Sequence, residues 1–372
     1  MNKYFENVKK NFGFGCMRFP MVDGEVDCEE TKKMVDAFLA NGFNYFDTAH
    51  GYLQGKSETA LRECLTSRYP REAYILTNKL SNHHFAKNEE IRPLFKSQLE
   101  ACGVDYFDFY LMHAQDKTSF AKYKECQAYE TVMEMRKEGL IKHLGISFHD
   151  KAVVLEQILS EYPQIEVVQI QLNYVDFDDA YVESGKCLEV CRKFGKPAII
   201  MEPVKGGALV NLPEEAQKIF DELNGGSNAS YAIRFAASQE GVMMVLSGMG
   251  NMDMMNDNIS YMKDFEPLSE KEQEAVEKVC KIFTDLGAVS CTACRYCTEV
   301  CPQEIPIPAA FACLNAKKIF NDPNAGYYYR EIHTKESGKA SDCLKCGLCE
   351  DICPQHLAIR ELLEKVAEVF EK

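Results

Sequence analysis

A regular alternation of short apolar strands with amphipathic helices constrains the fold of this chain more than any other feature. A glycine-punctuated segment at Phe12–Pro20 begins the series. The further expected strands are Phe43–Asp47, Tyr74–Lys79, Phe107–His113, His143–Ser147, Val167–Asn173, Ala198–Glu202 and Val242–Ser247. The expected helices are Glu29–Asn41, Ser57–Ser67, Glu89–Cys102, Tyr123–Glu138, Lys151–Tyr162, Val182–Phe194, Ala229–Ser238 and Asp253–Met262. Such alternation is typical of a parallel sheet covered on both faces. Eight units in about 260 residues predict an α/β protein built on a closed (β/α)8 TIM barrel.

An open nucleotide-binding sheet of the Rossmann type is the alternative architecture. That fold requires G-x-G-x-x-G at the start of its first helix. Gly13 and Gly15 provide two of the three glycines, but the third is missing and no helix follows at once. The closed barrel is therefore the expected fold.

Polar residues stand at the ends of three successive strands. Asp47, Lys79 and His113 each end one strand, and Tyr52 follows Asp47 in the loop. Parallel barrels build active sites at the carboxyl ends of their strands, so we expect these side chains to meet. A neighbouring ammonium lowers the pKa of a tyrosine, a carboxylate holds the ammonium in place, and a histidine can position a carbonyl oxygen. The set predicts that Tyr52 exchanges a proton with a carbonyl or alcohol oxygen.

Each of these residues also has an ordinary structural interpretation. Asp47 and Lys79 can form a structural ion pair. His113 can be a buried histidine with satisfied hydrogen bonds, and Tyr52 can be a loop aromatic. The catalytic interpretation is favoured because all four lie at matching strand ends, where active-site residues concentrate.

The segment Asp47-Thr48-Ala49, with Tyr52, Lys79 and His113, resembles the tetrad of the aldo-keto reductase superfamily in chain order and in approximate spacing. The resemblance covers roughly residues 8 to 262. It implies a barrel without a metal that binds NAD(H) or NADP(H) and interconverts a carbonyl and an alcohol. The cofactor contacts that it implies are Gly15, Met17, Asp47, Ser147, Gln169, Met201, Glu202, Pro203, Gly206, Gly248, Asn251, Asp257 and Asn258.

Two of these cofactor contacts have structural alternatives, and two features depart from the family pattern. Ser147 can be a helix cap, and Gln169 can be a satisfied core amide. Met201 stands where the family often has a tyrosine against the nicotinamide. Residues 247–255 contain no Lys or Arg, although a 2′-phosphate usually needs a cationic partner. We therefore expect weak or absent NADPH preference, with NADH able to serve.

The substrate pocket is expected in the loops that follow the strands. We place His83, His84, Phe85, Phe148 and residues 174–177 there, from loop position alone. The identity of the small-molecule carbonyl or alcohol substrate does not follow from these residues.

A cysteine repeat marks a second domain near the C-terminus. Cys291, Cys294, Cys297 and Cys301 form C-x2-C-x2-C-x3-C-P, and the motif recurs about forty residues later. The second copy contains Cys343, Cys346, Cys349 and Cys353. We expect the barrel over residues 1–265, a connecting helix over 266–288, and a smaller, mainly helical iron–sulfur domain over 289–372. The helical pattern at Ile307–Phe320 supports the last expectation.

The repeat resembles the cysteine pattern of bacterial ferredoxins with two [4Fe–4S] clusters. By that resemblance, the first three cysteines of one copy and the fourth of the other share a cluster. One set is Cys291, Cys294, Cys297 and Cys353, and the other is Cys343, Cys346, Cys349 and Cys301. A pair of all-thiolate zinc sites is the alternative, but the third cysteine of each run and the following proline favour iron–sulfur clusters.

Composition excludes several classes of protein. The net charge of −15 disfavours nucleic acid and anionic membranes as partners. No apolar run approaches the ~18 residues of a membrane span, and the N-terminal residues have no signal-peptide core, so we expect a cytoplasmic protein. The chain has 17 cysteines, and the nine outside the repeat are expected to be inert buried thiols, such as Cys187 and Cys191.

The two parts of the chain handle electrons differently. Hydride transfer moves two electrons together, a cluster moves one at a time, and a flavin usually joins such steps. Three hypotheses follow. In the first, the protein is a nicotinamide-dependent carbonyl reductase whose clusters exchange electrons with a partner such as a ferredoxin. In the second, it is the same reductase, and the clusters only stabilise the fold. In the third, the barrel is catalytically idle or binds another cofactor such as flavin, and the protein is an electron-transfer or redox-sensing module.

Overall fold

The computed structural model describes residues 4–179, 182–223, 225–320 and 325–372. By their internal contacts these residues form two compact units. The first contains residues 1–178, 183–203 and 232–268, and the second contains 179–182, 204–231 and 269–372. The segment 204–231 therefore groups with the C-terminal residues although it lies within the sequence of the expected barrel. The domain boundaries predicted at residues 265 and 289 stay a prediction.

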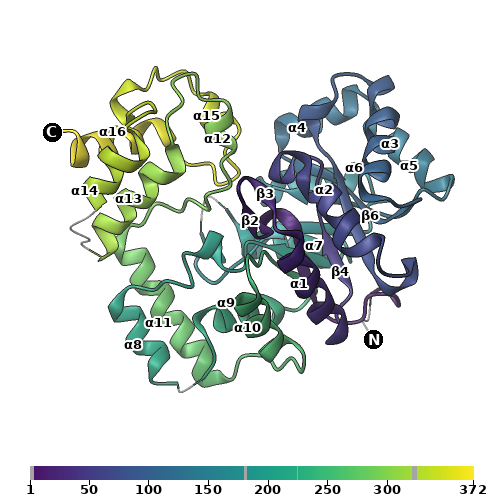
Figure 1. Cartoon of the computed structure of the whole chain (residues 1–372), viewed down its shortest axis with the longest axis horizontal. Coiled ribbons are helices and arrows are strands. Elements are labelled where there is room, and N and C mark those ends of the chain that lie inside the picture. The colour runs from purple at the N-terminus through teal and green to yellow at the C-terminus, as the bar shows by residue number, and fades with distance from the viewer. Residues whose placement is uncertain (1–3, 180–181, 224, 321–324) are drawn as a thin grey trace. The chain divides into compact units, whose positions relative to one another are not determined.

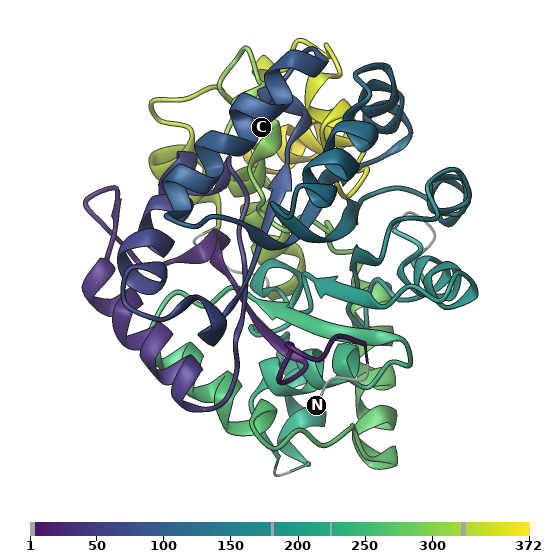
Figure 2. The same ribbon diagram turned by 90° about the vertical axis from the view of Figure 1, so that its right-hand side faces the viewer.

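The first unit contains a closed parallel barrel, as the sequence predicted. Its strands pair in the order β1-β10-β9-β8-β7-β6-β5-β4, and β1 pairs with β4 to close the ring. The strands are β1 Phe12–Gly15, β4 Tyr45–Asp47, β5 Ile75–Leu80, β6 Phe107–Gln115, β7 Ile141–Phe148, β8 Val167–Gln171, β9 Ala198–Met201 and β10 Val242–Ser247. An unpredicted antiparallel hairpin, β2 Met21–Val22 and β3 Glu25–Val26, follows β1. Figures 1 and 2 show the helices of this unit outside the ring of strands.

Helices separate the successive strands of the barrel. They are α1 Cys28–Ala40, α2 Lys56–Leu61, α3 Ile91–Cys102, α4 Lys117–Glu125, α5 Ala128–Lys137, α6 Ala152–Glu161, α7 Ser184–Lys193, α9 Asn228–Ala237 and α10 Met252–Met262. The single helix predicted over Tyr123–Glu138 is wrong. The structure has α4 and α5 instead, because Gln127 adopts a left-handed φ of 51° between them and ends the first helix. Within the part of the chain that the structure describes, no helix is long and apolar enough to span a membrane.

A buried cluster of side chains comes from most of the barrel strands. Tyr45, Ile75, Phe109 and Leu111 are buried there, and Val8 from the N-terminal segment packs against them. Glycine is required at position 145, because a Cβ would lie 2.5 Å from side-chain atoms of Leu111 and Val167. This filled core leaves the carboxyl ends of the strands as the place for chemistry.

The second unit is mainly helical, as expected. It contains α8 Glu214–Asp221, α11 Glu270–Leu286, α12 Tyr296–Glu299, α13 Ile307–Phe320, α14 Ala325–Tyr327, α15 Leu348–Asp351 and α16 Ile359–Phe370. Helix α8, which the sequence did not predict, packs against α11. Helix α11 begins with a capping box in which Ser269 and Glu272 bond each other's backbone N–H groups, and it ends at left-handed Gly287.

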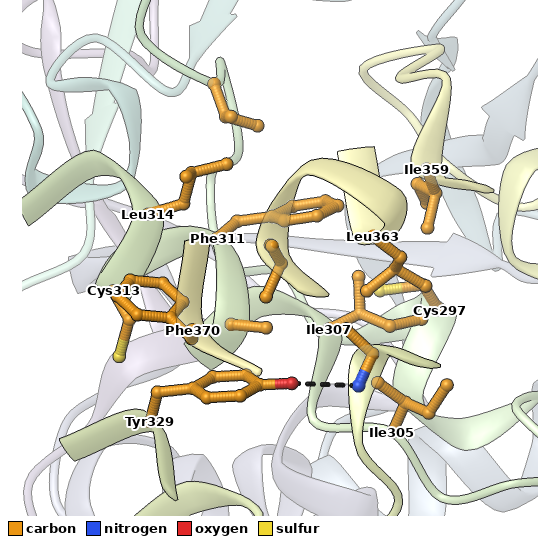
Figure 3. Close-up of a cluster of buried hydrophobic side chains, with 14 of the residues drawn as sticks. Cys297, Ile305, Ile307, Phe311, Cys313, Leu314, Tyr329, Ile359, Leu363 and Phe370 are labelled. Atoms are coloured by element: carbon orange, nitrogen blue, oxygen red, sulfur yellow. Dashed lines mark hydrogen bonds between the residues drawn. The ribbon is translucent and has the colours of Figure 1, made fainter. Parts of the chain in front are cut away.

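Helices α13 and α16 hold the core of the second unit together. Phe311, Leu314, Leu363 and Phe370 are buried between them and the cysteine loops (Figure 3). Tyr329 lies flat against Phe370, with ring centroids 5.1 Å apart, and its hydroxyl accepts a hydrogen bond of 2.8 Å from the backbone of Ala340. These contacts fix the segments on either side of the cysteine loops.

Candidate functional site

The four predicted catalytic residues meet at the carboxyl end of the barrel strands. Asp47 ends β4, Lys79 lies in β5 and His113 in β6, and Tyr52 begins the 3-10 turn η2, Tyr52–Gly55. The Lys79 Nζ donates to Asp47 Oδ1 at 2.5 Å and to the Tyr52 hydroxyl at 3.1 Å. A third bond of 2.9 Å runs from Nζ to the Thr48 carbonyl. The three donors of the ammonium are thus all used, and the lysine has one orientation.

The Asp47–Lys79 ion pair is fully enclosed by the barrel. Lys79 has no exposed surface, and the second carboxylate oxygen of Asp47 accepts 3.1 Å from Gln169 Nε2. Burial raises the pKa of Asp47, and the neighbouring Lys79 opposes that rise. Desolvation offsets much of the attraction in such a pair, and its hydrogen bonds hold the Lys79 ammonium beside the Tyr52 hydroxyl.

Tyr52 differs from the expectation in its acidity. The sequence predicted that Lys79 lowers the pKa of this hydroxyl; that contribution stays a prediction, because other causes set the net direction of the shift. Burial raises the pKa of Tyr52 well above its usual value, and the charges of Asp47, Cys16 and Glu202 raise it further. A tyrosine in this state keeps its proton and can act as an acid.

The backbone after Tyr52 is strained. Leu53 and Gln54 both adopt left-handed φ values, 53° and 58°, which cost energy for residues other than glycine. The strain lies in the turn that places the Tyr52 hydroxyl within reach of Lys79. Strain of this kind is typical of functional loops.

His113 is held neutral beside Tyr52. Its ring lies edge-on to the Tyr52 ring, with centroids 6.0 Å apart, and its Nδ1 is 2.6 Å from the Ser81 hydroxyl. Burial lowers the pKa of His113 well below its usual value, and the positive charge of Lys79 and three other histidines add to this effect. A neutral imidazole can position a carbonyl oxygen without adding a charge to the pocket.

The predicted cofactor contacts fall into three groups. The first group lies near the proposed catalytic residues and already has hydrogen-bond partners in the chain. Ser147 Oγ accepts a hydrogen bond of 3.2 Å from the Ala114 N–H, and Gln169 Nε2 donates one to Asp47. Residues at the last strand also bond one another, since Asn258 Nδ2 donates to Ser247 Oγ at 2.9 Å and Asn251 caps α10. The third group follows β9, where Glu202 has a left-handed φ of 56° and Pro203 ends a segment of the first unit.

Two predicted cofactor contacts belong to different units. Met201 ends β9 in the barrel, whereas Gly206 lies in the turn η7, Lys205–Gly207, of the second unit. A Cβ on Gly206 would lie 2.4 Å from the carbonyl oxygen of Thr292, which follows the first cysteine of the repeat. The loop expected at the pyrophosphate therefore packs against the first cysteine loop. Of the remaining predicted contacts, Gly15, Met17 and Gly248 lie at or beside the ends of β1 and β10, and Asp257 lies in α10.

Several residues around the site escaped sequence reasoning. Cys16 is buried, and burial and the neighbouring Asp47 carboxylate raise the pKa of its thiol; Ser81 holds the ring of His113. A buried Glu58 accepts 2.8 Å from His50 and 2.7 Å from Asn78, the residue before Lys79. None of these belongs to a motif, and only the folded barrel brings them together.

The two cysteine loops repeat one backbone conformation. Left-handed φ values occur at equivalent places, Ala293 and Lys345 before the second cysteine and Arg295 and Gly347 after it. Glu304 and His356, three residues after each fourth cysteine, repeat the pattern with φ of 51° and 49°. Alternation of right- and left-handed residues turns successive backbone N–H groups toward one point, which suits an anionic group such as a thiolate-bound cluster.

The cysteine side chains divide into the two expected sets. One cavity of about 330 Å³, including space open to solvent, is lined by Cys301, Cys343, Cys346 and Cys349. A second of about 320 Å³ is lined by Cys291, Cys294, Cys297 and Cys353. Burial raises the pKa of Cys297 to about 12, and the charges of the other three thiols of its set contribute. Four crowded thiols of this kind need a cationic centre to become thiolates, so the residues fit the implied clusters.

The cysteines outside the repeat are mostly buried. Seven of these nine are buried, and Cys28 and Cys280 are partly exposed. In the described ranges no three Cys, His, Asp or Glu side chains converge closely enough to bind a single metal ion. The cysteine sets line cavities instead of meeting at one point.

Comparison with known proteins identifies both regions. The sequence profile of the Aldo/keto reductase family matches residues 11–281, and that of a 4Fe-4S dicluster domain matches residues 290–358. An uncharacterized oxidoreductase of Schizosaccharomyces pombe is 26% identical over 271 residues, which cover 69% of this chain and 83% of that protein. An NADH-specific methylglyoxal reductase of Escherichia coli is 26% identical over 185 residues, covering 45% of this chain and 54% of that protein.

Solved structures show the same fold. An aldo-keto reductase from Bacillus halodurans, in its holo form, has a TM-score of 0.59 and 23% identity and covers 73% of this chain and 92% of its own. An aldo-keto reductase from Klebsiella pneumoniae in complex with NADPH has a TM-score of 0.58 and 17% identity. The match covers 73% of this chain and 95% of that protein. With the family profile spanning most of the sequence, the chain belongs to the aldo/keto reductase family and carries a C-terminal 4Fe-4S domain.

Proposed function

We propose that this chain is a nicotinamide-dependent oxidoreductase that reduces a small-molecule carbonyl to an alcohol. The observation that carries the proposal is the contact of one buried ammonium, Lys79, with both the Asp47 carboxylate and the Tyr52 hydroxyl. This arrangement fixes a protonated tyrosine at the mouth of the barrel. A structural ion pair alone would not account for a strained turn that brings Tyr52 to the same ammonium.

The roles of the residues follow from their chemistry. A reduced nicotinamide, when bound, supplies a hydride to the carbonyl carbon. Tyr52 donates its hydroxyl proton to the carbonyl oxygen, and the ammonium of Lys79 stabilises the tyrosinate that remains. Neutral His113 orients the carbonyl oxygen toward Tyr52, and solvent returns the proton afterwards. The raised pKa of Tyr52 means that its hydroxyl carries the proton that reduction requires.

Two similar proteins support a dinucleotide cofactor. One relative is an NADH-specific reductase, and one structural neighbour holds NADPH. Ser147 of β7, Gln169 of β8 and Asn258 of α10 would hold the cofactor. The side chains of these residues already form hydrogen bonds within the chain, so they would reorient or accept a second partner when the cofactor binds.

We also propose that the two cysteine sets hold two [4Fe–4S] clusters. Cys291, Cys294, Cys297 and Cys353 line one cavity. The second set, Cys301, Cys343, Cys346 and Cys349, lines the other. Such clusters accept and release single electrons, so a ferredoxin-type partner is the expected source or acceptor of those electrons.

A second function has specific support. Glu202 places a carboxylate near Tyr52, in the loop where the family binds pyrophosphate, and Met201 replaces an aromatic ring. Both features disfavour the dinucleotide. They support an electron-transfer or redox-sensing protein whose barrel is catalytically idle.

An anaerobic titration with NADH and then NADPH tests these alternatives. The absorbance and EPR signal of the clusters report their reduction, while a panel of small aldehydes and ketones reports turnover. We expect carbonyl turnover with at least one of the nucleotides. Absence of both binding and turnover would reject the reductase and favour the electron-transfer protein. Reduction of the clusters by a nicotinamide would show that the two parts share electrons.

A further inference from the structure

A buried carboxylate in the barrel unit has no part in the proposed proton transfer. Glu58 lies on α2, the helix that follows the turn η2, and 1% of its surface is exposed. One of its oxygens accepts a hydrogen bond of 2.8 Å from His50 Nδ1, and the other accepts one of 2.7 Å from Asn78 Nδ2. Burial of an unpaired carboxylate is costly, so these two partners hold Glu58 in place.

Asn78 connects Glu58 to the neighbouring Lys79. An ionised carboxylate only accepts hydrogen bonds, so it selects the NH2 side of the Asn78 amide. The amide oxygen of Asn78 accepts 2.8 Å from the Lys79 N–H and 3.0 Å from Gln98 Nε2. A further contact of Asn78 Nδ2, with the Cys102 sulfur at 3.7 Å, involves a weak acceptor. Glu58 therefore fixes which way this amide is turned.

Gln98 on α3 holds the carbonyl group of Lys79. Its Nε2 donates 2.9 Å to this carbonyl, and its Oε1 accepts 2.5 Å from the Tyr110 hydroxyl. Asn78, Gln98 and Tyr110 have no exposed surface, so these bonds are closed to solvent. Both backbone groups of Lys79 are thus held by buried amides, and the orientation of these amides begins at Glu58.

Glu58 also anchors the segment that carries Tyr52. The Tyr52 hydroxyl contacts the Lys79 ammonium at one end of this segment, and Glu58 bonds Asn78 of the same strand at the other end. The left-handed residues 53–54 lie between these two contacts. Strain of this kind persists only where the surroundings hold the backbone, and the bond from Asn78 to Glu58 is one such restraint.

We propose that Glu58 is a positioning residue for carbonyl reduction, and that it acts through Asn78 to set where the Lys79 ammonium meets the Tyr52 hydroxyl. This inference rests on the proposed function and adds a residue that does not act on the reacting atoms themselves. A carboxylate that only stabilised the barrel would change the free energy of unfolding. It would leave the contact between Lys79 and Tyr52 as it is, so the two roles are distinguishable.

NMR of the oxidised, anaerobic holoprotein labelled with ¹³Cζ-tyrosine reports on the Tyr52 hydroxyl, and Tyr52→Phe assigns its signal. Glu58→Met removes both acceptor oxygens, whereas Glu58→Gln keeps one for Asn78. We expect Glu58→Met to shift the Tyr52 signal and to lower kcat for a small aldehyde by about 10- to 100-fold, because the ammonium is displaced. KM for the nucleotide should stay as in the wild type, and Glu58→Gln should restore the signal and most of the rate. If Glu58→Met does not fold, Asn78→Leu interrupts the same path and replaces it.

The matched control is Asp108→Leu, which removes another buried carboxylate of the barrel, one that is 2% exposed and lies 2.6 Å from Arg71. It should lower the melting temperature and leave the Tyr52 signal and kcat unchanged. If Glu58→Met lowers only the stability, or if Asp108→Leu shifts the Tyr52 signal as much, the inference is overturned. A wild type that reduces no carbonyl would reject the proposed reductase itself, and the Tyr52 signal would still decide whether Glu58 positions the contact.

Discussion

The barrel site and the cysteine loops reach their geometry by different means. At the barrel mouth, Lys79 is fixed by three hydrogen bonds from its own chain and Asp47 by two partners. In the second unit, four cysteines line each of two cavities. Burial and the repulsion between neighbouring thiolates raise the pKa of Cys297 in one of these sets. The proposed catalytic residues are therefore already held by their own chain, whereas the proposed cluster cysteines would need a cationic centre to stabilise their thiolates.

The largest expected effect concerns the barrel alone. Tyr52→Phe removes the proton donor but keeps the ring beside Lys79, so carbonyl reduction should fall by about 10²- to 10⁴-fold. Nucleotide affinity and cluster absorbance should stay as in the wild type. Steady-state rates with a small aldehyde, calorimetry and the visible spectrum measure the three quantities. Wild-type turnover in this variant would remove Tyr52 from the mechanism.

The pH dependence of the wild type is the control for this assignment. Because the pKa of Tyr52 is raised and that of His113 is lowered, both groups keep their reactive protonation states across the neutral range. The reduction rate should be level between pH 7 and 9, the range between the usual pKa values of about 6.5 for histidine and 10 for tyrosine. A fall in rate on approaching pH 9 would mean that Lys79 lowers the pKa of Tyr52 after all.

The second effect concerns one cysteine set. Cys349→Ser removes a ligand from the set with Cys301, Cys343 and Cys346, so the iron content should fall from about eight to about four atoms per chain. Cys191→Ser, a buried thiol on α7 of the barrel unit, is the matched control and should retain the iron. Iron analysis and EPR under anaerobic conditions measure the result. Equal iron loss in both variants would contradict the assigned set.

The smallest effect tests the contact between η7 and the first cysteine loop. Gly206→Ala would place a Cβ against the Thr292 carbonyl. The control, Gly287→Ala, adds a Cβ at a similar φ of 57° where no other heavy atom lies within 4 Å. The clash should reduce the stability of the second unit by about 1–3 kcal/mol more than the control does. Thermal unfolding followed by loss of cluster absorbance compares the two. Equal unfolding midpoints of the two variants would mean that η7 and the first cysteine loop can separate with no loss of stability.

The sequence predicted the barrel because its periodicity is local. Strand and helix patterns, the tetrad and the cysteine repeat all lie within short windows, and the family profiles confirm both regions. The break at Gln127 was missed because a left-handed glutamine has no sequence signature. Arg18 beside Gly248, and Ser81 beside His113, were missed because strand pairing alone brings them together.

The net direction of the pKa shift of Tyr52 did not follow from the sequence for a related reason. The sequence placed a lysine next to a tyrosine, and the rule for neighbouring charges gave a lowered pKa. The structure adds burial and the negative charge of Asp47, and their combined effect is larger. Burial depends on the whole fold, so no local pattern reports it.

The path of the chain through the two compact units has a consequence for synthesis on the ribosome. Residues 204–231 leave the ribosome before most of their own unit, residues 269–372, has been made. Translation of the intervening and following chain, from residue 232 to residue 372, takes roughly 7–30 s at ordinary elongation rates. During this time α8 lacks α11, the helix against which it packs. A gene cut after residue 268 would leave α8 without the helix against which it packs, so the chain order of the two units is not that of a simple tandem fusion.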